Sequence, residues 1–166
     1  MIRRIALYGV GLLAALAVGV TAVGYALPQD HVASREVVFP AAPAAVFAVI
    51  ADVGRYPEWR VGVTTEIVST DPLTWRETSG GDVVTFKVEE KRAPELLRVR
   101  IADPDLPFGG SWTYELAPAP SGTRLRITEH GEVYNPIFRF MSRFVFGHTA
   151  TIDGFIAALE KRLHPS

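Results

Sequence analysis

The sequence contains no cysteine among its 166 residues. This absence excludes a disulfide framework, a thiolate nucleophile and zinc sites that depend on cysteine ligands. The chain also carries almost no net charge, with a formal value of −1 at pH 7. A nearly neutral chain has no general attraction to the phosphates of DNA or RNA, so nucleic acid is not an expected partner. Charged residues still make up 21% and hydrophobic ones 48%, which is typical of a folded chain rather than a disordered one.

One long segment lacks charged residues altogether, because no Asp, Glu, Lys or Arg occurs from Ile5 to Leu27. As a helix this segment would be about 34 Å long, enough to cross a hydrocarbon core of ~30 Å. Arg3 and Arg4 precede it, so the positive-inside rule predicts a cytoplasmic N-terminus and an exported C-terminal domain. The alternative is a cleaved signal peptide, which would leave the domain secreted. We favour an uncleaved single-pass anchor in the cell membrane, because the apolar run is long for a signal peptide.

These observations divide the chain into an anchor or signal segment over residues 1–30 and one domain over residues 31–166. In the domain, runs of β-branched and aromatic residues alternate with turn residues, which predicts an antiparallel meander. A first strand is expected at His31–Phe39 and a short helix from Pro43 to Ala51. Six more strands are expected at Val61–Thr70, Leu73–Ser79, Asp82–Arg92, Glu95–Ala102, Ser111–Ala117 and Thr123–Val133. After an N-cap at Asn135, apolar residues at helical spacing predict one long helix over Pro136–Leu163.

Several local motifs accompany this order of elements. They are Val38-Phe39-Pro40, Ala42-Pro43-Ala44-Ala45-Val46-Phe47, Tyr56-Pro57-Glu58-Trp59, Gly122-Thr123-Arg124-Leu125 and Gly147-His148. With these motifs the chain resembles the START-like helix-grip superfamily, often called SRPBCC, and most closely its polyketide cyclase/dehydrase-like branch. The resemblance implies an α+β fold in which a curved antiparallel sheet of about seven strands wraps around the long C-terminal helix. It also implies an apolar cavity between sheet and helix, here behind one transmembrane helix.

Strand alternation indicates which side chains face that helix. In the last strand Leu125 and Ile127 share a face, and the same alternation places Glu129 on it. The expected lining of the cavity is mostly aromatic and branched aliphatic. It comprises Trp75, Phe86, Trp112, Tyr114, Ile127, Glu129, Phe140, Phe144, His148 and Ile152.

Glu129 is the one acid on this expected inner face, and an unpaired buried carboxylate is costly. His148, on the apolar face of the long helix, is the expected partner. Such a pair in an apolar cavity can act as general acid and base or bind the polar end of a ligand. Two alternatives remain open: a bulge that turns Glu129 to solvent, and a His148 that serves only the core.

The sequence predicts no metal and no cofactor. His130, Glu132 and His148 match no established zinc spacing, and alternation turns His130 away from Glu129. No nucleophile elbow surrounds a serine, and no glycine-rich phosphate loop follows a strand.

Three functions are compatible with these residues. The favoured one is a membrane-tethered binding domain whose apolar cavity holds a hydrophobic small molecule or lipid. The second is an enzyme of cyclase, aromatase or dehydratase type that uses Glu129 and His148 as acid and base. The third is a domain without a ligand that acts in envelope assembly through its surface. The sequence leaves the oligomeric state open.

Overall fold

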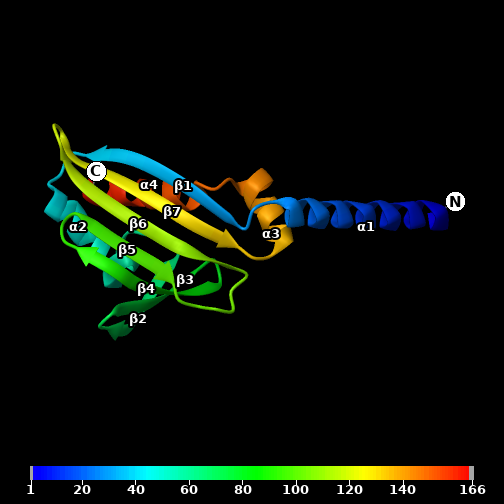
Figure 1. The fold of residues 1–166 in the computed structure, drawn as a ribbon, viewed down its shortest axis with the longest axis horizontal. Coiled ribbons are helices and arrows are strands. Elements are labelled where there is room, and N and C mark those ends of the chain that lie inside the picture. Colours follow the sequence, from blue (N-terminus) through cyan, green and yellow to red (C-terminus); the bar gives the residue numbers. More distant parts are fainter. Residues whose placement is uncertain (1, 165–166) are drawn as a thin grey trace.

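The structure is a computed structural model that describes residues 2–164, apart from the side chains of residues 2–7 and 146. A protruding helix, α1 (Ile2–Ala26), precedes a domain of seven strands and several short helices (Figure 1). The strands are β1 (Asp30–Phe39), β2 (Val63–Thr70), β3 (Leu73–Ser79), β4 (Asp82–Arg92), β5 (Leu96–Ile101), β6 (Phe108–Ala119) and β7 (Gly122–Val133). The helices of the domain are α2 (Pro43–Ala51), a 3₁₀ helix (Val53–Glu58), α3 (Pro136–Met141), a π-helical turn (Ser142–Phe146) and α4 (Ala150–Leu163).

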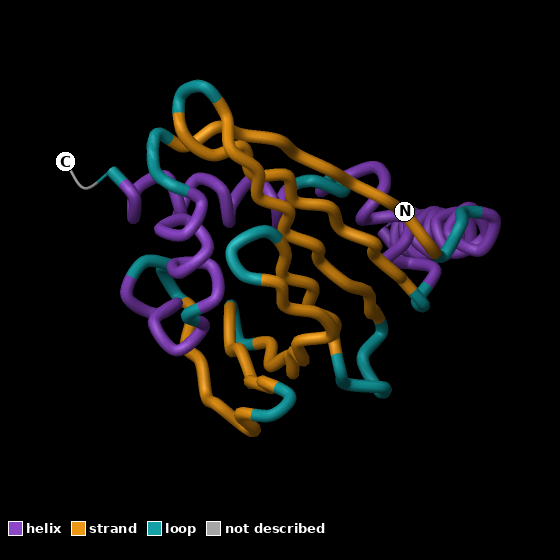
Figure 2. The backbone as a smooth tube through the Cα atoms, turned by 60° about the vertical axis from the view of Figure 1, so that its left-hand side comes forward, coloured by secondary structure: helices purple, strands orange, loops and turns teal. Residues whose placement is uncertain are grey.

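The seven strands form one antiparallel sheet in the order β1-β7-β6-β5-β4-β3-β2. Hairpins join consecutive strands from β2 to β7, and β1 closes the arrangement by pairing with β7. Figure 2 shows the sheet curving around the helices of the domain. The predicted antiparallel meander is confirmed, and β3 and β4 have the expected bounds. This is the helix-grip architecture that the family resemblance implies.

The core lies between the concave face of the sheet and helices α2 and α4. Ile50 of α2 and Ile152 and Leu159 of α4 are almost fully buried against the sheet. Burial in β7 alternates as expected, with Leu125 and Ile127 buried and Arg124 and Arg126 exposed. The alternation places one face of β7 toward α4, and this face carries Glu129.

The single long helix predicted over Pro136–Leu163 is confirmed only in part, because the segment is helical on both sides of a break. The chain forms α3, continues through the π-helical turn, leaves the helical conformation at Gly147 and restarts as α4. Gly147 has φ +76° and ψ 161°, a conformation that glycine adopts without steric cost and that no helix contains. Apolar spacing indicates which face of a helix is buried, and it does not reveal whether the backbone is continuous.

Helix α1 projects away from the domain (Figure 1), and from Tyr8 onward the domain covers it mainly toward its C-terminal end. Its span Tyr8–Ala26 has a mean hydropathy of 1.9 and is long and apolar enough to cross a membrane. Gly24 is buried where an added Cβ would lie 1.9 Å from the carbonyl oxygen of Pro136, so α1 and α3 touch through their backbones. Arg139 of α3 donates hydrogen bonds to the carbonyl oxygens of Gly24 (3.3 Å) and Leu27 (3.2 Å). The end of α1 is thereby attached to the domain.

Candidate ligand-binding cavity

A cavity of about 400 Å³ lies between the sheet and α4. Eight of the ten residues predicted to line it do so: Trp75, Phe86, Trp112, Tyr114, Ile127, Glu129, His148 and Ile152. Val84, Val99, Ile101 and Phe155 extend the apolar wall. Trp75 and Phe86 stack with ring centroids 5.3 Å apart, and Phe86 meets Trp112 edge to face at 5.8 Å. Such a lining offers burial energy to an apolar ligand.

Phe140 and Phe144, the other two predicted lining residues, do not reach the cavity. They lie in α3 and the π-helical turn, where their rings contact each other at 4.9 Å. Phe144 is 59% exposed. The physical reason is the break at Gly147, because the turns before it pack mainly against the end of α1 and do not continue α4 across the sheet.

Glu129 is buried in the cavity wall, as strand alternation predicts. The Trp112 Nε1 donates a hydrogen bond of 2.9 Å to one carboxylate oxygen. Burial raises the pKa of Glu129 above its usual value, and the bond from Trp112 partly opposes this rise. The carboxyl group therefore holds its proton to a higher pH than an exposed glutamate does.

The neighbour of this carboxyl group is His31, and the predicted direct pairing with His148 is wrong. The Nε2 atom of His31 lies 3.6 Å from the second carboxylate oxygen of Glu129. His148 stacks on the other side of His31, with ring centroids 4.0 Å apart and an interplanar angle of 29°. The Oγ of Ser142 lies 3.2 Å from the Nδ1 of His148. Glu129, His31, His148 and Ser142 thus form a continuous polar row in the cavity wall, which we call the histidine row.

His31 reaches this position because Gly131 opposes it in the sheet. The two residues are paired across β1 and β7, and a Cβ on Gly131 would lie 2.2 Å from the Cε1 of His31. The imidazole therefore fills the space that a side chain at position 131 would need. Sequence analysis missed His31 because it lies 98 positions from Glu129 and only the register of β1 on β7 brings the two together.

Both imidazoles have a lowered pKa, which favours their neutral forms near pH 7. Burial lowers the pKa of His31, against a smaller rise from the charge of Asp30. Burial also lowers the pKa of His148, and the positive charges of His31 and Arg143 lower it further. A neutral imidazole donates through one nitrogen and accepts through the other. The histidine row can therefore donate to and accept from a polar group at the end of an otherwise apolar ligand.

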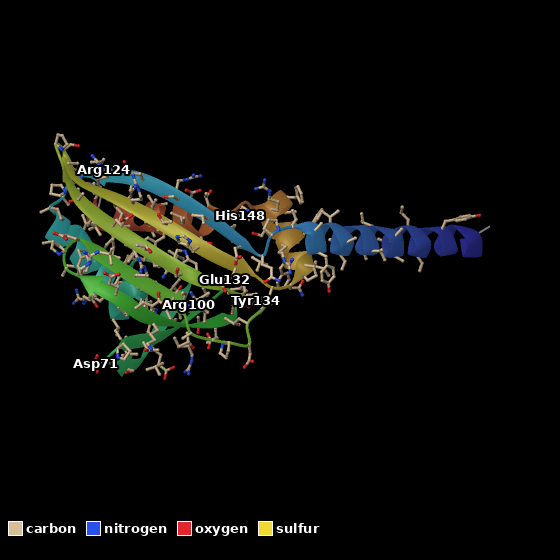
Figure 3. All side chains as sticks on the ribbon, in the orientation of Figure 1. Asp71, Arg100, Arg124, Glu132, Tyr134 and His148 are labelled. Carbon is tan, nitrogen blue, oxygen red and sulfur yellow. The ribbon has the colours of Figure 1, made fainter. Side chains whose placement is uncertain are left out.

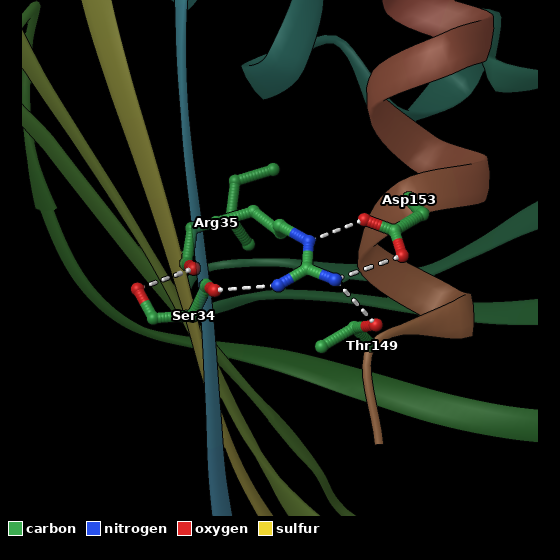
Figure 4. Close-up of polar contacts among 5 residues, drawn as sticks. Ser34, Arg35, Thr149 and Asp153 are labelled. Carbon is green, nitrogen blue, oxygen red and sulfur yellow. Dashed lines mark hydrogen bonds and ion pairs between the residues drawn. The ribbon is translucent and has the colours of Figure 1, made fainter. Parts of the chain in front are cut away.

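An ionic clamp holds the segment that carries His148. Arg35 of β1 donates to Asp153 (2.8 Å) and to Thr149 (2.9 Å) at the start of α4, as Figure 4 shows. The hydrogen bond from Arg35 lowers the pKa of the Asp153 carboxyl. Figure 3 places His148 toward the α1 end of the domain, the end at which Glu132 and Tyr134 also lie.

A second polar group, also missed from the sequence, lies in the opposite part of the cavity wall. Arg60 and Glu77 form a two-pronged ion pair with N···O distances of 2.7 and 2.8 Å. The Arg60 guanidinium also lies 4.9 Å from the centre of the Tyr56 ring. Burial raises the pKa of Tyr114 well above its usual range; Arg60 opposes the rise, while Glu77 and Glu129 add to it. Charges from both the Arg60–Glu77 pair and the histidine row therefore act on the Tyr114 hydroxyl.

The three residues considered as metal ligands do not converge. His130 is exposed on the opposite face of β7 from Glu129, as alternation requires. Glu132 instead accepts hydrogen bonds from Arg100 (3.0 Å) and the Tyr134 hydroxyl.

Comparison with known protein families identifies the family of this chain. Residues 30–164 match the family described as polyketide cyclase / dehydrase and lipid transport. The chain belongs to this family. The match covers the whole sheet and α4 of this polyketide cyclase / dehydrase-family domain and begins just after α1. None of the curated proteins matches the sequence.

Solved structures share the fold of this family member. A START superfamily protein from Mycobacterium smegmatis is 20% identical, with a TM-score of 0.64 over 80% of this chain and 97% of its own. Norcoclaurine synthase from Thalictrum flavum, in complex with dopamine and hydroxybenzaldehyde, is 15% identical, with a TM-score of 0.64 over 82% and 89%. The di-domain ARO/CYC protein StfQ from the steffimycin biosynthetic pathway is 11% identical, with a TM-score of 0.62 over 80% and 50%. At these identities the likeness concerns the fold alone.

Proposed function

We propose that this protein is a membrane-anchored binding domain that holds a hydrophobic small molecule or lipid in its cavity. The observation that carries the proposal is the separation of apolar from polar side chains in the cavity wall. Most of the wall is aromatic and branched aliphatic, and its acidic, basic and imidazole side chains are limited to the histidine row, the Arg60–Glu77 pair and Glu132. An amphiphile fits this division, with its apolar body against Trp75, Phe86 and Val99 and its polar end at the histidine row.

The apolar helix α1 supports the membrane part of the proposal. With Arg3 and Arg4 ahead of the span, the N-terminus is cytoplasmic and the domain lies across the membrane. The family description, which includes lipid transport, is consistent with a ligand drawn from that membrane.

The proposal is tested by extracting the full chain, purified from membranes, with organic solvent and identifying the released compounds by mass spectrometry. We expect a species that Ile127→Trp reduces by about tenfold or more, because the larger ring fills the cavity and costs at least ~1.4 kcal/mol of binding. Ile127 is only 1% exposed. The matched control is Ile67→Trp, since Ile67 of β2 is 44% exposed.

A second cavity-filling variant, Val99→Phe, provides an independent test in case Ile127→Trp does not fold. The thermal unfolding midpoint of each variant shows whether it is folded. A compound that persists at wild-type levels in folded Ile127→Trp and Val99→Phe would contradict binding in this cavity. A wild-type extract with no compound beyond that of the detergent would contradict the proposal as well.

One observation favours the enzymatic alternative, in which a cyclase, aromatase or dehydratase-type reaction occurs in the same cavity. A carboxyl group of raised pKa lies beside a neutral imidazole, which is the pairing that general acid–base catalysis uses. In this alternative His31, and not His148, is the partner of Glu129. His148 stacks behind it and orients the ring.

Glu129→Gln separates the two functions, because glutamine keeps the acceptor for Trp112 and loses the acidic proton. For a binding domain we expect the amount of extracted compound to change by no more than a few-fold, with the same compound in both extracts. An enzyme would lose about 10²–10⁴-fold in turnover, and the extract would shift from product to unreacted substrate. An extract that shifts in this way would contradict the purely binding function.

A further inference from the structure

A patch of apolar side chains is exposed on α3 and the π-helical turn. Ile137, Phe138, Phe144 and Val145 are 47, 49, 59 and 58% exposed, and we call these four residues the α3 face. Two of them are phenylalanines, which have no polar atom to offer water. A cluster of this kind on a folded domain marks an interaction surface.

The position of the α3 face indicates what covers it. Figure 1 shows α3 beside the C-terminal end of α1, and the Arg139 bonds to Gly24 and Leu27 attach the two helices there. From Tyr8 to Ala26 the span of α1 is about 28 Å long, close to the ~30 Å of a hydrocarbon core. The α3 face therefore lies at the depth where the span ends, which is the level of the lipid headgroups.

Polar and aromatic residues around the patch suit that level. Tyr25 and Tyr134 are 70 and 43% exposed close to the junction of α1 and α3, and tyrosine is enriched at membrane interfaces. Arg143, in the same turn as Phe144, is exposed and can approach anionic headgroups. An amphipathic segment with this composition lies in the interface plane with its apolar side chains among the acyl chains.

A small pocket lies between this segment and the main cavity. It has a volume of about 250 Å³ and is lined in part by Leu27, Arg139 and Arg143. It shares His31, Val133, Ser142 and His148 with the main cavity, so the stacked imidazoles form part of the wall between the two. His31, His148 and Ser142 of the histidine row thus lie between the cavity and the junction of α1 with α3.

We propose that the α3 face is embedded in the interface of the lipid bilayer and forms a second membrane contact of the domain beside α1. The inference rests on the membrane anchoring in the proposed function. It implies that the domain is held close to the bilayer in one orientation, with the small pocket and the histidine row next to the headgroups. A ligand from the membrane then has a short path to the cavity.

The absence of cysteine makes a direct test available. Single cysteines introduced as Phe144→Cys and Phe138→Cys are labelled with the fluorophore NBD, and the full chain is reconstituted in vesicles of phosphatidylcholine and phosphatidylglycerol. The control is Val68→Cys, since Val68 is also half exposed (52%) but lies on β2 at the far edge of the sheet. We expect blue-shifted emission at positions 138 and 144 and about threefold stronger quenching by doxyl-labelled lipids than at position 68.

Flotation of the same vesicles distinguishes a failure of the membrane anchor from a failure of the contact made by the α3 face. A chain that does not float with the vesicles would contradict the membrane anchor and the inference together. A floating chain whose labels at 138 and 144 are quenched no more than that at 68 would overturn the inference alone. Blue-shifted labels that lipid quenchers do not reach would also overturn it, because the α3 face would then be covered by a second copy of the chain.

Discussion

Glu77→Leu is expected to lower the free energy of unfolding by about 3–5 kcal/mol, because it leaves the largely buried Arg60 guanidinium without its partner. The side chains of Arg60 and Glu77 are only 19 and 10% exposed, and the two hydrogen bonds between them are short. A buried cation without a partner loses its hydration and gains no interaction that compensates for this loss. The effect is measured as the shift in the urea unfolding midpoint, followed by tryptophan fluorescence of the full chain in detergent micelles.

The control for this prediction is an ion pair of similar length on the surface. Glu66 and Arg76 lie 2.8 Å apart with side chains that are 70 and 45% exposed. Glu66→Leu should therefore cost less than ~1 kcal/mol. The double variant Arg60→Met with Glu77→Leu should recover much of the loss, because it removes the stranded charge. If Glu77→Leu costs no more than Glu66→Leu, the pair is not buried in the way described.

Acidification from pH 7.5 to 5.5 is expected to destabilise the protein through the two stacked histidines. Their pKa values in the folded protein are lowered from 6.5, so the unfolded chain binds more protons in this range. Stability is therefore fully present above pH 6.5 and falls as the pH drops toward the lowered pKa values. A histidine that stayed fully neutral at pH 5.5, one pH unit below 6.5, would cost about 1.4 kcal/mol. Because both rings are only partly buried, solvent screening keeps the expected loss for each of them below this value.

Stacking reinforces this effect, because two protonated rings 4.0 Å apart would repel each other. Glu129 acts in the opposite direction at lower pH, since its pKa is raised from 4.5, and for this reason the range ends at pH 5.5. The measurement is the unfolding free energy of the full chain as a function of pH. The double variant His31→Phe with His148→Phe should keep the stacked rings and flatten the profile.

His130→Gln is the matched control for this pH profile. His130 belongs to the same sheet as His31 but is exposed on its outer face, so the wild-type profile should persist. An unchanged slope in the phenylalanine double variant would show that other groups cause the acid sensitivity.

Local patterns in the sequence were sufficient for most of the fold. Turn residues delimit β3 and β4 at the predicted positions, because turn geometry depends on a few adjacent residues. Alternation in β7 correctly turned Glu129 inward, since successive side chains of a strand point to opposite faces. The family resemblance added the cavity, which periodicity alone does not distinguish from a filled core.

Local patterns do not show which residues, far apart in the sequence, lie close together in space. The pairing of His31 with Glu129 depends on the register of β1 against β7 and on the space beside Gly131. Arg60 meets Glu77 of β3 because the 3₁₀ helix before Arg60 lies against β2, the strand that pairs with β3. The positions of Phe140 and Phe144 depend on one backbone conformation at Gly147.

The order of elements, the inward row of β7 and the apolar span of α1 therefore follow from the amino-acid sequence, because each depends on neighbours a few positions away. The composition of the histidine row, the Arg60–Glu77 pair and the outward turn of the α3 face are decided by tertiary structure. They arise from contacts between strands and helices that only the complete fold brings together. The missing cysteine excluded thiol chemistry from the start, and the packing of the chain supplied an imidazole–carboxyl pair in the cavity wall.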